Sequence, residues 1–175
     1  MRVTIVLAMH GVPPSDFPRH ETGELFRLHS QLEQATGAER EAMKQRHDEL
    51  EEKMRAWPRN AKNDPFFGGS QELAEHLARA TGCAIIVGFN EFCGPSVEEA
   101  IEQAVREGAE KVITITPMMT RGGEHSERDI ALSVTAAQSR HPEIPMVYAW
   151  PFEVSEVAAF LATQTRRFME HPQKG

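Results

Sequence analysis

The chain has 175 residues, of which 40% are apolar and 26% are charged, and its formal net charge is −7. This length predicts a single domain with a sizeable core, and the acidic balance argues against a nucleic-acid partner, because neutralising phosphates requires a basic face. No apolar run reaches the length of a membrane span. Two cysteines, Cys83 and Cys93, are too few for a disulfide framework, so we expect a cytoplasmic protein without a membrane partner.

Four short apolar runs rich in β-branched residues predict strands that are covered on both faces. They are VTIVLA at 3–8, AIIVGF at 84–89, KVITIT at 111–116 and PMVYAW at 145–150. The first run has some features of a secretory signal, but it is short and no cleavage pattern follows it. We therefore interpret it as a strand.

Helical patterns lie between and after these strands. Residues 96–108 open with a capping box of Ser96 and Glu99 and end at a glycine. Further helices are predicted at 70–82, 126–140 and 155–169, and Ser126 with an acid three residues later suggests a second capping pair. Strands that alternate with helices imply a parallel sheet. The predicted fold is α/β, a four-stranded parallel, flavodoxin-like three-layer sandwich with the first strand beside the second and third.

The segment 22–57 departs from this alternation. It carries two sets of residues at steps of three and four, separated by a turn at Gly37, and this spacing predicts two antiparallel helices with a narrow apolar seam. We expect a helical hairpin inserted into a single domain that spans 1–175, and we interpret the dense charges of 39–55 as a solvated helix face. The two sets are Leu25, Leu28, Leu32 and Ala35, and then Met43, His47, Leu50 and Met54.

Polar side chains directly follow three of the predicted strands. His10 follows the first, Glu91 follows the second, and the loop TPMMTRGGEH after the third carries Arg121 and His125. Parallel sheets bind ligands at the carboxyl ends of their strands, near the point where the strand order reverses. Because the first and third strands are expected to be neighbours, the two histidines should project into one crevice with Glu91 on its flank.

Imidazole and carboxylate groups are ligands that cobalt, iron, nickel and zinc accept. We therefore expect His10 and His125 to be metal ligands and Glu91 to complete the set or act as a base. The alternative interpretation is that the two histidines are ordinary loop residues and that Glu91 is an exposed acid. Cys93 fits a small buried hydrophobe better than a soft metal ligand. We interpret the other six histidines as structural; they are His20, His29, His47, His76, His141 and His171.

Three stretches, VLAMHG, GFNEFCGPSVEEAI and KVITITPMMTRGGEHSERDI, together resemble the class II tetrapyrrole chelatases, and within them the small sirohydrochlorin cobaltochelatases and ferrochelatases. In that family, a histidine that ends the first strand and another in a later G-x-H loop hold the incoming metal, and an acid precedes a Pro-Ser helix start. His10, His125 and Glu91 match these places. The resemblance covers roughly 2–10 and 84–150, and the hairpin is a departure from the smallest members.

The resemblance implies a chelatase-like fold and a lyase that inserts cobalt or iron into sirohydrochlorin, in cobalamin or siroheme biosynthesis. His10, His125 and Glu91 would be the catalytic residues, and no organic cofactor is expected. A homodimer is also expected, because two-lobed members of the family close a cleft between two copies of the fold. The alternatives are a chelatase-like protein that binds metal or tetrapyrrole without turnover, and an unrelated flavodoxin-like domain whose histidines are structural.

The same resemblance suggests where the macrocycle would dock. Phe89, Met118 and Met119 would supply apolar surface, although core packing is the competing interpretation for such side chains. Sirohydrochlorin bears many carboxylates while the chain is acidic, so local positive charges must meet them. Arg121 and Arg128 are the predicted contacts.

Overall fold

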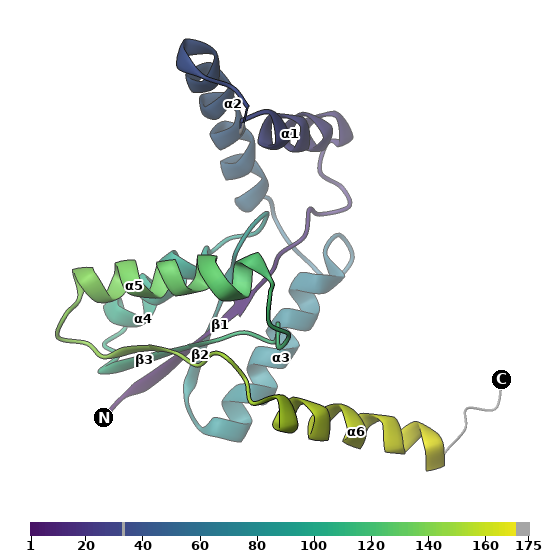
Figure 1. The fold of residues 1–175 in the computed structure, drawn as a ribbon, viewed down its shortest axis with the longest axis vertical. Helices are drawn as coiled ribbons and strands as arrows, with labels where there is room; N and C mark the ends of the chain where they lie inside the picture. Colours follow the sequence, from purple (N-terminus) through teal and green to yellow (C-terminus); the bar gives the residue numbers. More distant parts are fainter. Residues whose placement is uncertain (33, 171–175) are drawn as a thin grey trace.

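The computed structural model describes residues 1–32 and 34–170, and a parallel sheet lies at its centre (Figure 1). The strands are β1 (Val3–Met9), β2 (Ala84–Phe89), β3 (Lys111–Ile115) and β4 (Met146–Tyr148), in the order β2-β1-β3-β4. This order places β1 between β2 and β3 and confirms the predicted fold class. The N-terminal run is a strand, as predicted, and among the described residues no helix has the length and apolar character needed to cross a membrane.

Each face of the sheet has its own core. On one face, Val6 and Ala8 of β1 pack with helices α4 (Val97–Arg106) and α5 (Ile130–Arg140). On the other face, Leu7 and Met9 pack with α3 (Pro65–Thr81). Side chains of one strand therefore alternate between two helical layers, which explains why the strands read as continuous apolar runs. Figure 1 shows α3 across the sheet from α4 and α5.

Local side-chain chemistry sets the helix starts. The capping box of α4 is present as predicted: Ser96 Oγ accepts from the Glu99 amide at 3.1 Å, and Glu99 Oε2 accepts from the Ser96 amide at 2.7 Å. Helix α3 begins earlier than the predicted start at 70. Asp64 caps it by accepting from the Phe67 amide at 2.8 Å, with a proline in the first turn.

The prediction that Ser126 and the acid three residues later form a capping pair is wrong. The chain enters α5 through a π-helical turn, η1 (His125–Asp129), in which the Ser126 hydroxyl donates to the Gly123 carbonyl at 3.1 Å. The carboxylate of Asp129 faces His125 instead of capping the helix. Tyr148 of β4 holds this turn from the sheet side, because its hydroxyl donates to the Ser126 carbonyl at 2.8 Å.

Two helices form the predicted hairpin, α1 (Arg19–Leu32) and α2 (Gly37–Arg55). Leu25, Leu28, Leu50 and Met54 are buried in a separate small core with Phe17. Figure 1 shows the hairpin standing off the body at the end of the sheet toward which β1 points. The hairpin is thus placed over the carboxyl ends of the strands, where the predicted site lies.

The last described helix, α6 (Val154–Glu170), extends away from the body in Figure 1. Its apolar side chains are largely exposed, and so is Val147 on β4. His171 lies outside the described residues, so its predicted structural role has no counterpart here. The exposed apolar residues of α6 are Val154, Phe160, Leu161, Phe168 and Met169.

Candidate metal centre

His10, Glu91 and His125 converge at the carboxyl end of the sheet. Glu91 Oε1 lies 3.1 Å from His10 Nε2 and 3.6 Å from His125 Nε2. The two imidazole rings meet edge to face, with centroids 4.8 Å apart and an interplanar angle of 89°. Residues separated by more than a hundred positions in the chain are therefore neighbours, in the arrangement that the strand order predicted.

The far side of each imidazole is fixed by an acceptor. His10 Nδ1 lies 2.7 Å from the Gly11 carbonyl oxygen, and His125 Nδ1 lies 2.8 Å from Asp129 Oδ2. Because a carbonyl or carboxylate oxygen only accepts, Nδ1 carries the hydrogen in both rings, and the neutral ring presents its Nε2 lone pair to Glu91. Asp129 and the Gly11 carbonyl were not anticipated from the sequence.

Three acceptor atoms facing one point are suited to a cation. The ligand atoms of the three residues all lie within 4.8 Å of one another. A tetrahedral ion with bonds of about 2.1 Å separates its ligand atoms by about 3.4 Å, which is close to the two observed separations from Glu91. Three protein ligands leave a coordination position open. All three side chains are partly exposed, so an ion can enter and leave.

Backbone geometry brings Glu91 beside His10. The Glu91 amide donates to the His10 carbonyl at 3.0 Å, which continues the pairing of β1 and β2 beyond the strands. Gly11 has φ +101, and a Cβ built on it would lie 1.9 Å from the Glu91 carbonyl oxygen. Phe92 adopts φ 58, a conformation that is rare outside glycine. This loop is therefore tightly constrained around Glu91.

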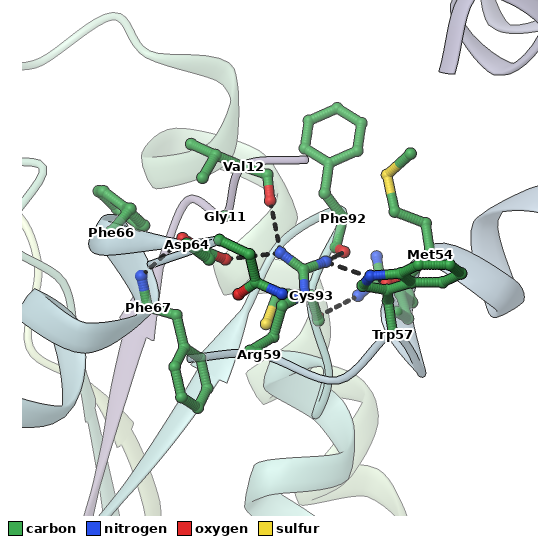
Figure 2. A network of polar contacts seen from close by, with 12 residues as sticks. Gly11, Val12, Met54, Trp57, Arg59, Asp64, Phe66, Phe67, Phe92 and Cys93 are labelled. Carbon is green, nitrogen blue, oxygen red and sulfur yellow. Dashed lines mark hydrogen bonds and ion pairs between the residues drawn. The ribbon is translucent and has the colours of Figure 1, made fainter. Parts of the chain in front are cut away.

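A buried ion pair ties the surrounding segments together (Figure 2). The Arg59 and Asp64 side chains are 4% and 1% exposed, and Arg59 Nη1 lies 2.5 Å from Asp64 Oδ2. The Arg59 guanidinium also donates to the Val12 carbonyl at 2.8 Å, to the Met54 carbonyl at 2.9 Å and to the Phe92 carbonyl. One side chain thus connects the loops after β1 and β2 with the end of α2 and the start of α3. The Asp-Pro pair that opens α3 was the only sequence signal for this network.

The two arginines predicted to meet substrate carboxylates pair with acids that are close to them in sequence. Arg121 Nε donates to Glu127 Oε1 at 2.8 Å, and Arg128 Nη1 lies 3.3 Å from Glu124 Oε1. The hydrogen bond from Arg121 holds the pKa of Glu127 below its ordinary value. Both guanidinium groups are exposed, so these pairs contribute little stability and can exchange partners.

The predicted apolar contacts divide into two groups. Phe89 is 1% exposed and stacks on Phe67 at 5.9 Å in the core beneath α3, so a ligand cannot reach its ring. This corrects the expectation of a substrate contact: Phe89 is the last residue of β2, and its ring packs under α3. Met118 and Met119 are partly exposed and line a cavity of about 540 Å³ with His10 and His125.

His125 lines two cavities. The one that holds the methionines is otherwise walled mostly by the loop after β3 and by Val157 and Leu161 of α6. The second, of about 360 Å³, lies between Glu91 and the hairpin. A larger hollow of about 1110 Å³ between α2 and α4 touches neither histidine of the centre. The hairpin residues of the second cavity are Leu25, Phe26, His29, His47 and Glu51.

Cys93 is buried beside this centre. Burial raises the pKa of its thiol above the ordinary value, and Sγ lies 3.4 Å from the Gly94 carbonyl, to which it can donate. The side chain belongs to the α3-side core. This agrees with the interpretation of Cys93 as a small buried hydrophobe.

The chain matches the model of a known protein family. The family model described as CbiX matches residues 68–167, which is more than half of the chain. The chain belongs to the CbiX family. The match includes Glu91 and His125 and leaves out His10 and the hairpin. It confirms the resemblance to class II chelatases seen in the sequence motifs.

Individual relatives support this CbiX assignment. The chain is 30% identical over 68 residues to the sirohydrochlorin ferrochelatase of Priestia megaterium, over 39% of this chain and 25% of that protein. It is 41% identical over 61 residues to the sirohydrochlorin cobaltochelatase of Methanopyrus kandleri, over 34% of this chain and 42% of that protein. The chain thus spans between a quarter and about two fifths of the length of these relatives.

A solved structure has the same CbiX fold. It is described as a cobalamin (vitamin B12) biosynthesis CbiX protein from Marinobacter aquaeolei VT8 and superposes with a TM-score of 0.52 at 15% identity. The superposition covers 96% of this chain and 98% of that one. At this identity the likeness establishes the fold, which is the α/β fold described above.

Proposed function

We propose that the chain inserts a divalent metal ion, cobalt or iron, into sirohydrochlorin, as a step of cobalamin or siroheme biosynthesis. The observation that carries this proposal is the convergence of His10, Glu91 and His125 on one point that lies open to a neighbouring cavity. The names of the curated relatives support the tetrapyrrole and include both metals. The residues need no organic cofactor for this reaction.

The chemistry requires a metal ion that is held but can be released. Two neutral imidazoles and one carboxylate bind a divalent ion with a net charge of +1, and the open position lets a pyrrole nitrogen attach first. The free macrocycle carries two pyrrole protons, and the metallated product carries none. We assign one proton to Glu91 as the ion leaves its carboxylate and the other to water, so that protons and charge balance.

The cavity lined by methionines is the proposed place for the macrocycle. Met118, Met119 and Leu161 offer apolar surface beside the two histidines, which suits the face of a tetrapyrrole. Arg121 lies in the same loop and Arg128 in the η1 turn that follows it, and both would exchange their present acids for carboxylates of the substrate. Holding the ring against the bound ion would supply the positioning part of the rate enhancement.

We propose that a second copy of the chain packs against α6. The exposed apolar residues of α6 give this helix an apolar surface, and one of them, Leu161, lines the cavity proposed for the macrocycle. A two-fold pairing through this surface would bury it and enclose the substrate from a second side. We place the protein in the cytoplasm, where its two unpaired cysteines would stay reduced.

An anaerobic insertion assay tests this function. The full chain is mixed with sirohydrochlorin and Co²⁺ or Fe²⁺, and insertion is followed by the change in the visible spectrum. We expect turnover by the natural protein, a loss of about 100-fold or more in His10→Ala and His125→Ala, and a comparable loss in Glu91→Gln. His76→Gln, an exposed histidine on α3, is the matched control and should retain full activity.

Two results would contradict the proposal. Unchanged turnover in both histidine variants would remove the ligand assignment. Tight binding of metal and tetrapyrrole by the natural protein without any insertion would instead indicate a carrier.

A further inference from the structure

The hairpin brings a second set of metal-ligand side chains to the smaller cavity. His29 comes from α1, and His47 and Glu51 lie one helical turn apart on α2, so that all three face the same space. The opposite wall of this cavity carries Glu91 and His125. In the described part of the chain, the lining of this cavity includes no lysine or arginine.

The two imidazoles and the acids of α2 lie near one another, and the His29 ring has to turn to bring a nitrogen within ligand distance of both His47 and Glu51. The His29 and His47 rings have centroids 5.6 Å apart and are tilted by 32°. His47 Nδ1 lies 3.9 Å from Glu51 Oε2 and 3.3 Å from Asp48 Oδ1, and the ligand atoms of these three α2 residues lie within 4.8 Å of one another. The His47 side chain is only 13% exposed, so it is largely withdrawn from water.

Neighbouring cations orient the two acids. Glu51 Oε1 accepts from Arg55 at 2.8 and 3.0 Å, and Asp48 Oδ2 pairs with Lys44. In each acid, the second oxygen is the one directed toward His47. This resembles the outer shell of a metal site, in which ligands are held by partners on their far side. Because Glu51 lines the cavity and Asp48 does not, Glu51 is the better ligand.

Packing alone does not account for this arrangement. His47 lies on the apolar seam of the hairpin, and its helical spacing is that of a residue that packs against the other helix. Its ring also lies beside a second imidazole and two carboxylates. Two imidazoles and one carboxylate are a donor set that Co²⁺, Fe²⁺ and Zn²⁺ accept.

We infer that His29, His47 and Glu51 form a second divalent-metal site, on the hairpin wall of the cavity whose other wall holds Glu91 and His125. An ion bound there lies beside the first centre, on the side away from the methionines, and can be passed across the cavity while the macrocycle occupies the other one. The binding of this ion stands independently, whereas its transfer rests on the proposed function.

Metal stoichiometry of the full chain tests the site. Equilibrium dialysis and calorimetric titration with CoCl₂ under anaerobic conditions should give two ions per natural chain. His29→Gln/His47→Gln should bind one ion, His10→Ala/His125→Ala should bind the other one, and the four-fold variant should bind neither. His76→Gln should bind two. Circular dichroism checks that each variant is folded, and glutamine preserves most of the size of His47.

The result that overturns the inference is unchanged stoichiometry and affinity in His29→Gln/His47→Gln, or a single ion in the natural chain that is lost with His10 and His125. If transfer operates, the hairpin variant needs about tenfold more Co²⁺ for half-maximal insertion, with kcat unchanged. Two bound ions without any insertion would support this second site and contradict the proposed reaction. Full insertion with a single bound ion would support the proposed reaction and contradict this second site.

Discussion

At the scale of single residues, the orientation of each imidazole depends on the group behind it. His10 and His125 can both present Nε2 to Glu91 because the Gly11 carbonyl and the Asp129 carboxylate each accept from Nδ1. Without these acceptors, either ring could rotate or change its tautomer, and the three ligand atoms would no longer face one point. The π-helical turn matters for the same reason, since it holds His125 and Asp129 on one side of the helix start.

Asp129→Asn should weaken Co²⁺ binding at the first centre by about 10- to 100-fold, because an amide can donate to Nδ1 and favours the wrong tautomer. The measurement is calorimetric titration in the His29→Gln/His47→Gln background, which leaves the first centre alone. Glu124→Gln is the control, because Glu124 precedes His125 but pairs only with Arg128. Equal affinities for the two variants would refute the positioning role of Asp129.

Gly11→Ala should destabilise the fold by about 1–3 kcal/mol, since its φ is positive and the new methyl group would collide with the Glu91 carbonyl. Urea unfolding measures the change. Gly23→Ala is the matched control: Gly23 lies in α1 with no atom near the added methyl, so that variant should be neutral or gain up to about 1 kcal/mol. A Gly11→Ala protein as stable as the natural one would show that the loop can relax.

At the scale of helices and strands, the Arg59 network decides how the hairpin and the two loops meet. Met54 ends the hairpin core, Val12 and Phe92 lie in the loops that follow His10 and Glu91, and Asp64 opens α3. A buried guanidinium with several acceptors therefore connects these segments through polar contacts, in addition to the apolar cluster that Phe17, Met54 and Phe92 share.

Arg59→Met should cost about 3–5 kcal/mol of unfolding free energy, because it leaves Asp64 buried without its partner. Arg59→Met/Asp64→Asn should recover part of this loss, since asparagine can still cap α3 and carries no charge. Arg79→Met, which removes an exposed ion pair on α3, should change stability by less than about 1 kcal/mol. Urea unfolding of the three variants decides the matter, and a cost for Arg59→Met as small as that for Arg79→Met would contradict the account.

Periodicity predicted some elements well and others poorly, for physical reasons. Strand β2 was predicted to the residue, because burial on both faces leaves a continuous apolar run. The start of α3 was missed because two glycines before Ser70 resemble a break, although the Asp64 cap and the following proline outweigh them. The π-helical turn was missed because its serine and aspartate have the same spacing as a capping box.

The candidate centre was predictable because it depends only on strand order. Residues that follow adjacent parallel strands must lie close together, which is enough to join His10, Glu91 and His125. The placement of His29 and His47 on one cavity with Glu91 was not predictable, since helical spacing says which face is apolar and not what lies opposite the hairpin. Phe89 was misjudged as a ligand contact because a strand's last residue can point either to the rim or into the core.

At the scale of the whole molecule, α6 is the least covered element. Most of its large apolar side chains are exposed, and exposed Leu161 and half-buried Val157 line the cavity proposed for the macrocycle.

Phe160→Glu/Phe168→Glu should therefore convert a two-chain particle into a single chain, because charges would be placed in the proposed contact. Light scattering after size-exclusion chromatography measures the mass. Leu132→Glu is the control, since Leu132 is an exposed apolar residue on α5, away from α6. A natural protein that runs as a single chain at micromolar concentration would remove the proposed dimer.

The most direct test of the metal centre is the position of the ion itself. Crystals grown with Co²⁺ and measured at the cobalt absorption edge give an anomalous peak wherever cobalt binds. We expect one peak within about 2.3 Å of His10 Nε2, His125 Nε2 and a Glu91 oxygen. A cobalt-saturated crystal with no peak between these three side chains would contradict the proposed function at its foundation.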